Sequence, residues 1–492
     1  MTKVNVLTIA ITLLLFIGGP ALGEEETEYL AVFMQGKKVG HATLTRRVES
    51  DRVTTSEDVS ITISRVGIPV TVKMTETSIE TKAGKPLGFE SVQLLGMMAM
   101  KVSGKVDDAG LVEVTNSSFG AQQTSTVTWP EGAVMAEGLR LLTLKHGLEA
   151  GSEYSAKLFS AGIMQAIEAK VSVGQKKDVD LLGRVLKLTE VTTTLAMPGA
   201  GQIPSVSYVD DDMKTLKTST AVAGIEVDMI ACAKEFALGD NDVLEMIGMM
   251  FVNSPVSLDD PGSASAITYW IRPKPGADFT IPTTDNQTTT QLPDGAIKLA
   301  VEPVAAPSGG RMPYEGNDPA LREAVEPTRF LQSDREEIVA LARKAVGRTK
   351  DPAKAVKQIE AFVADYIEDR SLSVGYASAA EVAESRQGDC SEFAVLTAAM
   401  CRAVGIPAQV VVGVAYVAEF AGREGFGGHA WTQAYVGGKW VGLDAAFKGS
   451  GRGGHDAGHI ALATGNGEPS DFFNMASALG AFTIERIDVQ RD

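Results

Sequence analysis

Gly388-Asp389-Cys390-Ser391-Glu392 opens the best-patterned helix that the sequence predicts. Asp389 is a natural N-cap residue, and Gly388 supplies the sharp turn before it. Apolar residues then recur at helical spacing from Phe393 to Val404, and Gly405-Ile406-Pro407 ends the helix, with glycine just past it and proline beyond. Cys390 therefore lies at a helix N-terminus. There the macrodipole favours a thiolate, and its backbone N–H is well placed to donate to an oxyanion.

A predicted β-hairpin follows this helix. Residues 429–436 and 439–445 flank Gly437-Gly438, a strong signal for a two-residue turn. Because side chains alternate faces along each strand, this register puts His429 and Asp444 on one face as diagonal neighbours, roughly 7–8 Å apart between backbones. Two side chains can close that gap, so we expect a hydrogen bond between His429 and Asp444. A thiol, an imidazole and a carboxylate together are the groups that thiol acyl transfer needs.

Four blocks of this region resemble the core of the transglutaminase-like superfamily. They are Gly388-Asp389-Cys390-Ser391-Glu392, Arg402-Ala403-Val404-Gly405-Ile406-Pro407-Ala408, Gly428-His429-Ala430-Trp431 and Lys439-Trp440-Val441-Gly442-Leu443-Asp444. The resemblance covers about residues 330–487 and implies a papain-like α+β domain. By position it makes Cys390 the nucleophile, His429 the general base and acid, and Asp444 the residue that orients His429. The motifs do not assign the second oxyanion donor, for which Gln387 and Tyr416 are candidates, and Trp431 is expected in the core or the cleft wall.

The resemblance implies attack on a protein or peptide amide through an acyl-thioester intermediate. Water would then give a peptidase or amidase, and an amine would give transglutaminase-type transfer. We favour amide cleavage, because beyond the core motifs nothing resembles the Ca²⁺-regulated crosslinking enzymes. The alternative is a non-catalytic envelope binding or scaffold protein that uses the same core for recognition. The intact set of three residues argues against that alternative.

A metallohydrolase is a further alternative, built from His429, Asp444, His455 and His459 with bound zinc. His455 and His459 have an H-x₃-H spacing, but residues 449–459 are too rich in glycine for a helix. We therefore expect a mobile loop that flanks the site, with no metal and no cofactor. Cys401 is expected to be a core thiol, because it lies about 16 Å along the helix from Cys390.

The whole chain is predicted to be multidomain. Residues 24–253 have the short strands and recurring turns of an antiparallel β-rich domain, with one helix expected over 133–145. A small β subdomain is expected over 254–304 and a linker over 305–318, where Pro and Gly gather. Residues 319–492 hold the helices and the motif blocks. The β-rich half is interpreted as a module that binds a partner, a substrate or the envelope.

Bulk properties restrict where the protein acts. The 492 residues carry a formal charge of −17, which argues against nucleic-acid binding. Residues 1–23 have a lysine, an apolar run and Ala21-Leu22-Gly23, as in a secretory signal peptide, so we expect a periplasmic or extracellular protein without a stable membrane span. An uncleaved anchor is the alternative. Three cysteines do not make a disulfide scaffold, and the oligomeric state stays open.

Overall fold

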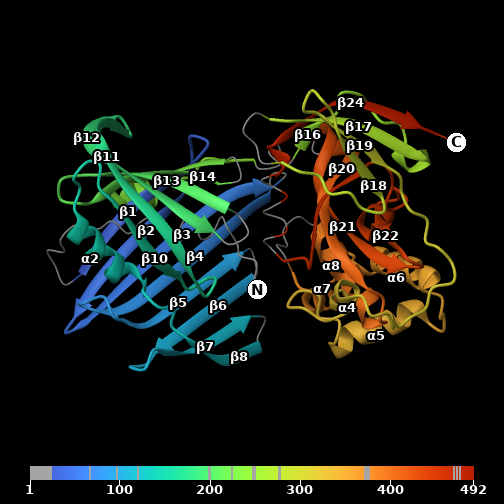
Figure 1. Ribbon diagram of the computed structural model, residues 1–492, viewed down its shortest axis with the longest axis horizontal. Helices are drawn as coiled ribbons and strands as arrows, with labels where there is room; N and C mark the ends of the chain where they lie inside the picture. The colour runs from blue at the N-terminus through green and yellow to red at the C-terminus, as the bar shows by residue number, and fades with distance from the viewer. Residues whose placement is uncertain are drawn as a thin grey trace. The chain divides into compact units, whose positions relative to one another are not determined.

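The computed structural model describes residues 25–491 with short gaps. The gaps are residues 66–67, 96–97, 119–120, 198–200, 223–224, 246–250, 275–278, 371–376, 421, 469–470, 472–474 and 476–477. The predicted signal peptide, residues 1–23, lies outside the described residues. The chain divides into two compact units, residues 1–245 and 246–492, and each is described by itself (Figure 1).

The first unit is built on one antiparallel meander. Strands β1 to β8 follow one another to one edge of a 15-stranded sheet, while β15 pairs with β1 and the order runs back from β15 to β9 at the other edge. Its strands are β1 (Glu25–Met34), β2 (Lys37–Glu49), β3 (Arg52–Arg65), β4 (Ile68–Thr81), β5 (Pro86–Leu95), β6 (Met98–Val106), β7 (Leu111–Ser118), β8 (Ala121–Thr128), β9 (Ala133–Val134), β10 (Glu153–Ser160), β11 (Gln165–Leu181), β12 (Arg184–Met197), β13 (Gly201–Val209), β14 (Thr215–Val222) and β15 (Ile225–Ala231). Its helices are α2 (Ala136–His146) and α3 (Lys234–Ala237).

This sheet is bent, since strands far apart in its order share a core. Phe89 of β5 lies 4.9 Å from Phe159 of β10 between ring centroids, and valines of β7 join the same cluster. Helix α2, close to the helix expected over 133–145, is fixed at its N-terminus by Glu80 of β4, which accepts from the backbone N–H groups of Glu137 and Gly138. Bending is the usual solution for a sheet of this many strands.

The second unit combines two antiparallel sheets with a group of helices. One sheet has the order β16-β21-β20-β23 with β22 paired to β21, and the other has the order β18-β19-β17-β24. Its strands are β16 (Phe251–Asn253), β17 (Ala266–Pro273), β18 (Gln287–Gln291), β19 (Ile297–Val301), β20 (Ala408–Phe420), β21 (Arg423–Val436), β22 (Lys439–Leu443), β23 (His459–Gly465) and β24 (Phe482–Gln490). Its helices are α4 (Pro319–Glu323), α5 (Glu336–Val346), α6 (Pro352–Tyr366), α7 (Ala379–Ser385), α8 (Cys390–Ala403) and α9 (Ala445–Gly449).

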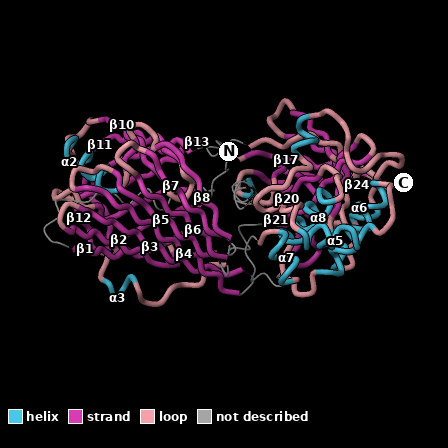
Figure 2. Tube along the Cα trace, turned by 90° about the horizontal axis from the view of Figure 1, so that it is seen from below, coloured by secondary structure: helices cyan, strands magenta, loops and turns pink. Residues whose placement is uncertain are grey.

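The helices of this unit gather on one side of β20 and β21, as Figure 2 shows. Asp351 caps α6 by accepting from the N–H of Ala353, and an apolar stripe on α6 is buried. Helix α8 is buried along most of its length, which makes it the centre of the core. The expected fold class, a β-rich part followed by an α+β transglutaminase-like part, agrees with this architecture.

The second unit corrects two predicted boundaries. Residues 254–304 do not form a subdomain of their own, because β17 pairs with β24 at the far end of the chain and Ile267 shares one core with Phe393 of α8. The segment 305–318 runs within the same unit, where the N–H of Tyr314 donates to the carbonyl of Gly405 at 2.7 Å. A four-stranded sheet of this size buries too little apolar surface to be stable alone, which explains why it shares one hydrophobic core with the helices.

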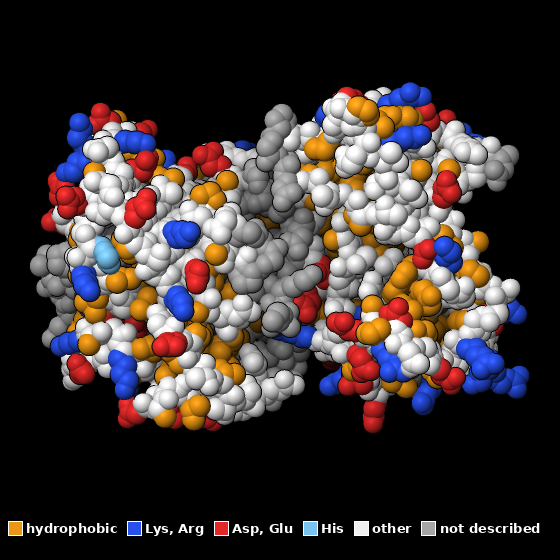
Figure 3. All heavy atoms as spheres, viewed as in Figure 1, with side chains coloured by type: hydrophobic (Ala, Val, Ile, Leu, Met, Phe, Trp, Pro, Cys, Tyr) orange, Lys and Arg blue, Asp and Glu red, His pale blue; other side chains and the backbone are white. Residues whose placement is uncertain are grey.

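The described part of the chain contains no helix of sufficient length and apolarity to span a membrane. On the face shown in Figure 3, Lys and Arg side chains lie among Asp and Glu side chains over each unit. The acidic excess therefore does not collect in a single patch on that face.

Candidate active site

The N-terminus of α8 is held by a dense set of hydrogen bonds. Asp389 accepts from the N–H of Ser391 at 3.0 Å, and Glu392 accepts from the N–H of Asp389 at 2.9 Å, which completes a capping box. Glu392 is fully buried and also accepts from the N–H of Ala377 at 2.9 Å. A Cβ at Gly388 would lie 2.2 Å from the Cβ of Glu392, so only glycine fits at this turn.

Cys390 is the first residue of α8, as the sequence predicts, and it is half-buried. Its helix packs against β21, the strand that carries His429. The two elements are joined where the hydroxyl of Thr432 donates to the carbonyl of Ala394 at 2.9 Å, one helical turn after Cys390. The positive end of the α8 dipole thus lies at the thiol.

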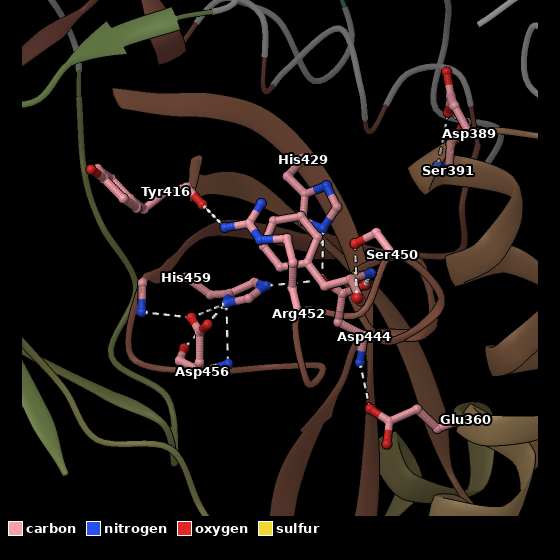
Figure 4. Close-up of polar contacts among 12 residues, drawn as sticks. Glu360, Asp389, Ser391, Tyr416, His429, Asp444, Ser450, Arg452, Asp456 and His459 are labelled. Carbon is pink, nitrogen blue, oxygen red and sulfur yellow. Dashed lines mark hydrogen bonds and ion pairs between the residues drawn. The ribbon is translucent and has the colours of Figure 1, made fainter. Parts of the chain in front are cut away.

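The predicted hydrogen bond between His429 and Asp444 is present. The hairpin has the expected register, with Val436 opposite Lys439. His429 Nε2 lies 2.8 Å from Asp444 Oδ2, and both side chains are buried (Figure 4). The second strand is shorter than predicted, because it ends at Leu443 and Asp444 caps helix α9, with Oδ1 accepting from the N–H of Phe447 at 3.0 Å. A helix cap therefore fixes the carboxylate that orients the imidazole.

His459 corrects the prediction for the glycine-rich segment. Instead of lying in a mobile flanking loop, it begins strand β23 and is 1% exposed. Its Nε2 lies 3.0 Å from Asp444 Oδ2, the oxygen that also accepts from His429. Its Nδ1 lies 2.9 Å from Asp456 Oδ1. The signal in the sequence was the apolar run that follows His459, which is typical of a buried strand.

Glu360 is a second residue that the sequence analysis missed. It lies on the buried stripe of α6 and is 1% exposed, and its Oε1 accepts from the backbone N–H of Asp444 at 2.8 Å. Lys357 lies 3.3 Å from the other carboxylate oxygen. An acid at a core position of an amphipathic helix was the available signal. Glu360 thus holds the backbone of Asp444 in place from a different element.

Aromatic rings enclose the two histidines. The ring of Phe447 stacks on His429 at 4.4 Å between centroids, and the guanidinium of Arg452 lies 3.8 Å from the centre of the Phe447 ring. Trp431 is 3% exposed and meets His459 edge-on at 5.1 Å. Trp431 is therefore a core residue that supports the histidines, one of the two places expected for it.

The two other candidates differ in their surroundings. The hydroxyl of Tyr416 is buried, accepts from the N–H of Leu258 at 2.8 Å and donates to Glu424 at 2.5 Å. The one hydrogen of that hydroxyl is thus donated to Glu424, which argues against the predicted role as an oxyanion donor. Gln387 is half-buried three residues before Cys390, and its role as an oxyanion donor stays a prediction.

The electrostatics of the site follow from these contacts. Burial alone would raise the pKa of Asp444, but His429 and His459 hold it well below its usual range. For His459, burial by itself would lower the pKa. The hydrogen bonds of His459 to Asp444 and Asp456 outweigh burial and raise its pKa to about 9. At neutral pH the site thus contains an imidazolium at His459 between two carboxylates.

His429, Asp444 and His459 also place one ligand atom each within 4.8 Å of one another. Two imidazoles and a carboxylate are a donor set that a divalent metal can use. Here the nitrogens of His429 and His459 that would have to bind the metal lie at hydrogen-bond distance from Asp444, and His459 is protonated at neutral pH. A divalent metal bound here would have to displace that proton.

Comparison with known proteins supports the assignment of the second unit. Residues 339–445 match the family model of the transglutaminase-like superfamily, so the prediction for the C-terminal third is confirmed. Members of this superfamily are typically cysteine peptidases or acyltransferases.

Two solved structures show weaker likenesses. A candidate cysteine protease from Cytophaga hutchinsonii is 19% identical, with 46% of this chain and 86% of that chain covered and a TM-score of 0.30. A candidate protease from Parabacteroides distasonis is 12% identical, with 83% and 70% covered and a TM-score of 0.20. These likenesses are too weak to carry a functional assignment. No curated protein matches the chain.

Proposed function

We propose that this protein is a thiol enzyme that cleaves amide bonds of proteins or peptides, with Cys390 as nucleophile, His429 as base and acid, and Asp444 as the group that orients His429. The buried bond of 2.8 Å between His429 Nε2 and Asp444 Oδ2 is the observation that supports this most strongly. It commits one ring nitrogen to the carboxylate, and the other, Nδ1, is the atom that we propose takes the proton of the thiol. The packing of α8 against β21 supports the same pairing.

In the first half of the reaction, His429 Nδ1 takes the proton of the Cys390 thiol, and the sulfur attacks the amide carbonyl. The resulting oxyanion forms at the positive end of the α8 dipole. The C–N bond then breaks, the leaving amine takes the proton from His429, and a thioester to Cys390 remains. Asp444 stabilises the imidazolium that exists between these two proton transfers.

In the second half, water attacks the thioester carbonyl while His429 takes its proton. The C–S bond breaks, the carboxylic acid leaves, and the thiol regains its proton from His429. An amine in place of water would form a new amide, as in transglutamination. We propose hydrolysis as the main reaction, because beyond the core blocks the chain does not resemble the Ca²⁺-regulated crosslinking enzymes.

Alkylation by iodoacetamide at neutral pH tests the nucleophile, and the chain supplies its own controls. Burial raises the pKa of Cys401 to about 12 and also raises the pKa of the half-buried Cys232. Because the thiolate is the reactive form, we expect Cys390 to label much faster than Cys232 and Cys401 to stay unlabelled. Peptide mapping by mass spectrometry reads out all three sites. His429→Ala should slow labelling of Cys390 and leave Cys232 unchanged.

Labelling of Cys390 no faster than Cys232 would contradict the mechanism. Slow labelling together with tight binding of a protein partner would favour a recognition or scaffold role. Stoichiometric zinc in the purified protein, lost together with activity in His459→Ala but not in Cys390→Ala, would favour a metallohydrolase.

We further propose that the protein is exported, with residues 1–23 as its signal peptide and a protein or peptide outside the cytoplasm as its substrate. The apolar run of this segment and the small residues before Glu24 support the proposal. The intact mass of protein recovered from the periplasm or the medium tests it. A mass that retains residues 1–23 would favour an uncleaved anchor.

A further inference from the structure

His459 is the least expected part of the site, and both of its ring nitrogens face a carboxylate. Nε2 lies 3.0 Å from Asp444 Oδ2. Nδ1 lies 2.9 Å from Asp456 Oδ1, and 3.2 Å from both the carbonyl oxygen and the backbone nitrogen of Asp456. The N–H of Asp456 points at Nδ1, but the carboxylate oxygen of Asp456 lies closer, at 2.9 Å. A carboxylate oxygen at that distance from a ring nitrogen needs a hydrogen between the two atoms, so Nδ1 carries a hydrogen. With a hydrogen on each nitrogen, the ring is an imidazolium.

Asp444 Oδ2 thus receives two imidazoles at once, from His429 and from His459 (Figure 4). The two rings lie 5.7 Å apart between centroids. Asp456, His459, Asp444 and His429 form one continuous hydrogen-bonded chain, and the positive charge in its middle lies close to the ring that must accept a proton from the thiol. Such a charge disfavours a second positive charge on His429.

We propose that His459 is a positioning residue with an electrostatic role. Its charged ring fixes the Asp444 carboxylate and places a positive charge 5.7 Å from the ring of His429. This inference rests on the proposed function of Cys390 and His429. It adds a fourth and a fifth residue, His459 and Asp456, to the three that the superfamily resemblance implies.

None of the other charged or titratable groups named below would replace the positive charge of His459 in a variant at position 459. Burial lowers the pKa of the neighbouring His455 to about 3, so that ring is neutral. Arg452 interacts with both carboxylates from the segment after α9. Glu360 of α6 contacts the Asp444 backbone N–H and has Lys357 and Lys448 near its other oxygen. These groups belong to α6, to α9 and to the segment after α9, and they remain in place when residue 459 alone is changed.

The pH dependence of Cys390 alkylation separates charge from structure. With the anion iodoacetate as reagent, the reaction reports the upper pH limit of the proposed Cys390–His429 ion pair. Above that limit His429 has lost its proton, and the remaining thiolate reacts more slowly with the anion because the neighbouring positive charge is gone. Removing a like charge 5.7 Å away should raise the midpoint of that loss by about 0.5 to 2 pH units, for effective dielectric constants between that of water and about 20. In His459→Gln the amide can still donate to Asp444 without a charge, so we expect this upward shift with a plateau rate within about threefold of wild type.

His459→Leu is the matched variant that removes both the charge and the donor. We expect its plateau rate of Cys390 alkylation to fall by about tenfold, because Asp444 then loses one of its hydrogen-bond donors. His459→Gln keeps that donor and should therefore show most of the wild-type rate. A purely structural role for His459 would lower rates without moving the midpoint at the upper pH limit.

The outcomes distinguish this inference from the proposed function. If wild-type Cys390 labels no faster than Cys232, the proposed function fails. If wild type labels fast but the upper midpoint is unchanged in His459→Gln, the role of His459 is overturned. ¹⁵N NMR of histidine-labelled wild type gives a test that needs no variant. The ring of His459 should hold a proton on both nitrogens at about pH 8, where an ordinary histidine is neutral, and a neutral His459 ring at that pH would also overturn the inference.

Discussion

The charge on His459 also predicts how the stability of the second unit depends on pH. The pKa of this ring is about 9 in the folded protein and 6.5 without the fold. Between these two values the folded state binds a proton that the unfolded chain does not. The stabilisation is therefore fully present below about pH 6.5 and is lost as the pH rises through about 9. The difference between these two pKa values corresponds to about 3 kcal/mol of unfolding free energy for this fully buried ring.

His459→Gln removes this titration and keeps a hydrogen-bond donor in place. We expect wild type to lose about 3 kcal/mol more unfolding free energy than the variant between pH 6.5 and 9. Urea unfolding followed by tryptophan fluorescence measures this, since Trp270, Trp431 and Trp440 report on the second unit. Other groups that titrate in this range, such as Glu76 with a pKa of about 7, are present in both proteins and cancel in the comparison.

Equal pH dependence of the unfolding free energy in the two proteins would refute this prediction. If wild type and His459→Gln lose the same unfolding free energy over this range with equal m-values, His459 does not hold a proton in the folded state. The reasoning from its two carboxylate partners would then be wrong, even if the variant were less stable at every pH. A difference in unfolding free energy that is the same at every pH would report only a lost contact.

Two further substitutions test the framework of the site. Gly388→Ala places a methyl group 2.2 Å from the Cβ of buried Glu392, so we expect a loss of about 1–3 kcal/mol in unfolding free energy and slower alkylation of Cys390; unchanged alkylation would show that this turn does not position the thiol. Tyr416→Phe leaves the N–H of Leu258 without its acceptor, so stability should fall by about 1–3 kcal/mol while the alkylation rate of Cys390 stays at the wild-type value. A strong loss of activity in the stable fraction of Tyr416→Phe would make that hydroxyl a candidate oxyanion donor again.

Local patterns were sufficient to predict the parts of the site that depend on neighbouring residues. The N-cap at Asp389 and the glycine and proline after Val404 bound helix α8 at the predicted place. The Gly437-Gly438 turn set the hairpin register, and this register brought His429 to Asp444. These predictions hold because helix caps and two-residue turns have few allowed geometries, which depend on a few adjacent residues.

Long-range pairing decided the rest. The sequence alone showed His459 only as part of a glycine-rich segment, and it reaches Asp444 because β23 pairs with β20, some fifty residues earlier in the chain. The strands of the predicted small β subdomain likewise joined β24 and the core around α8. Such partners are chosen by burial of apolar faces across the whole unit, which no local spacing encodes. The sequence by itself thus determined the Cys390 helix and the His429–Asp444 pair, and only the tertiary structure placed a second, charged histidine on that carboxylate.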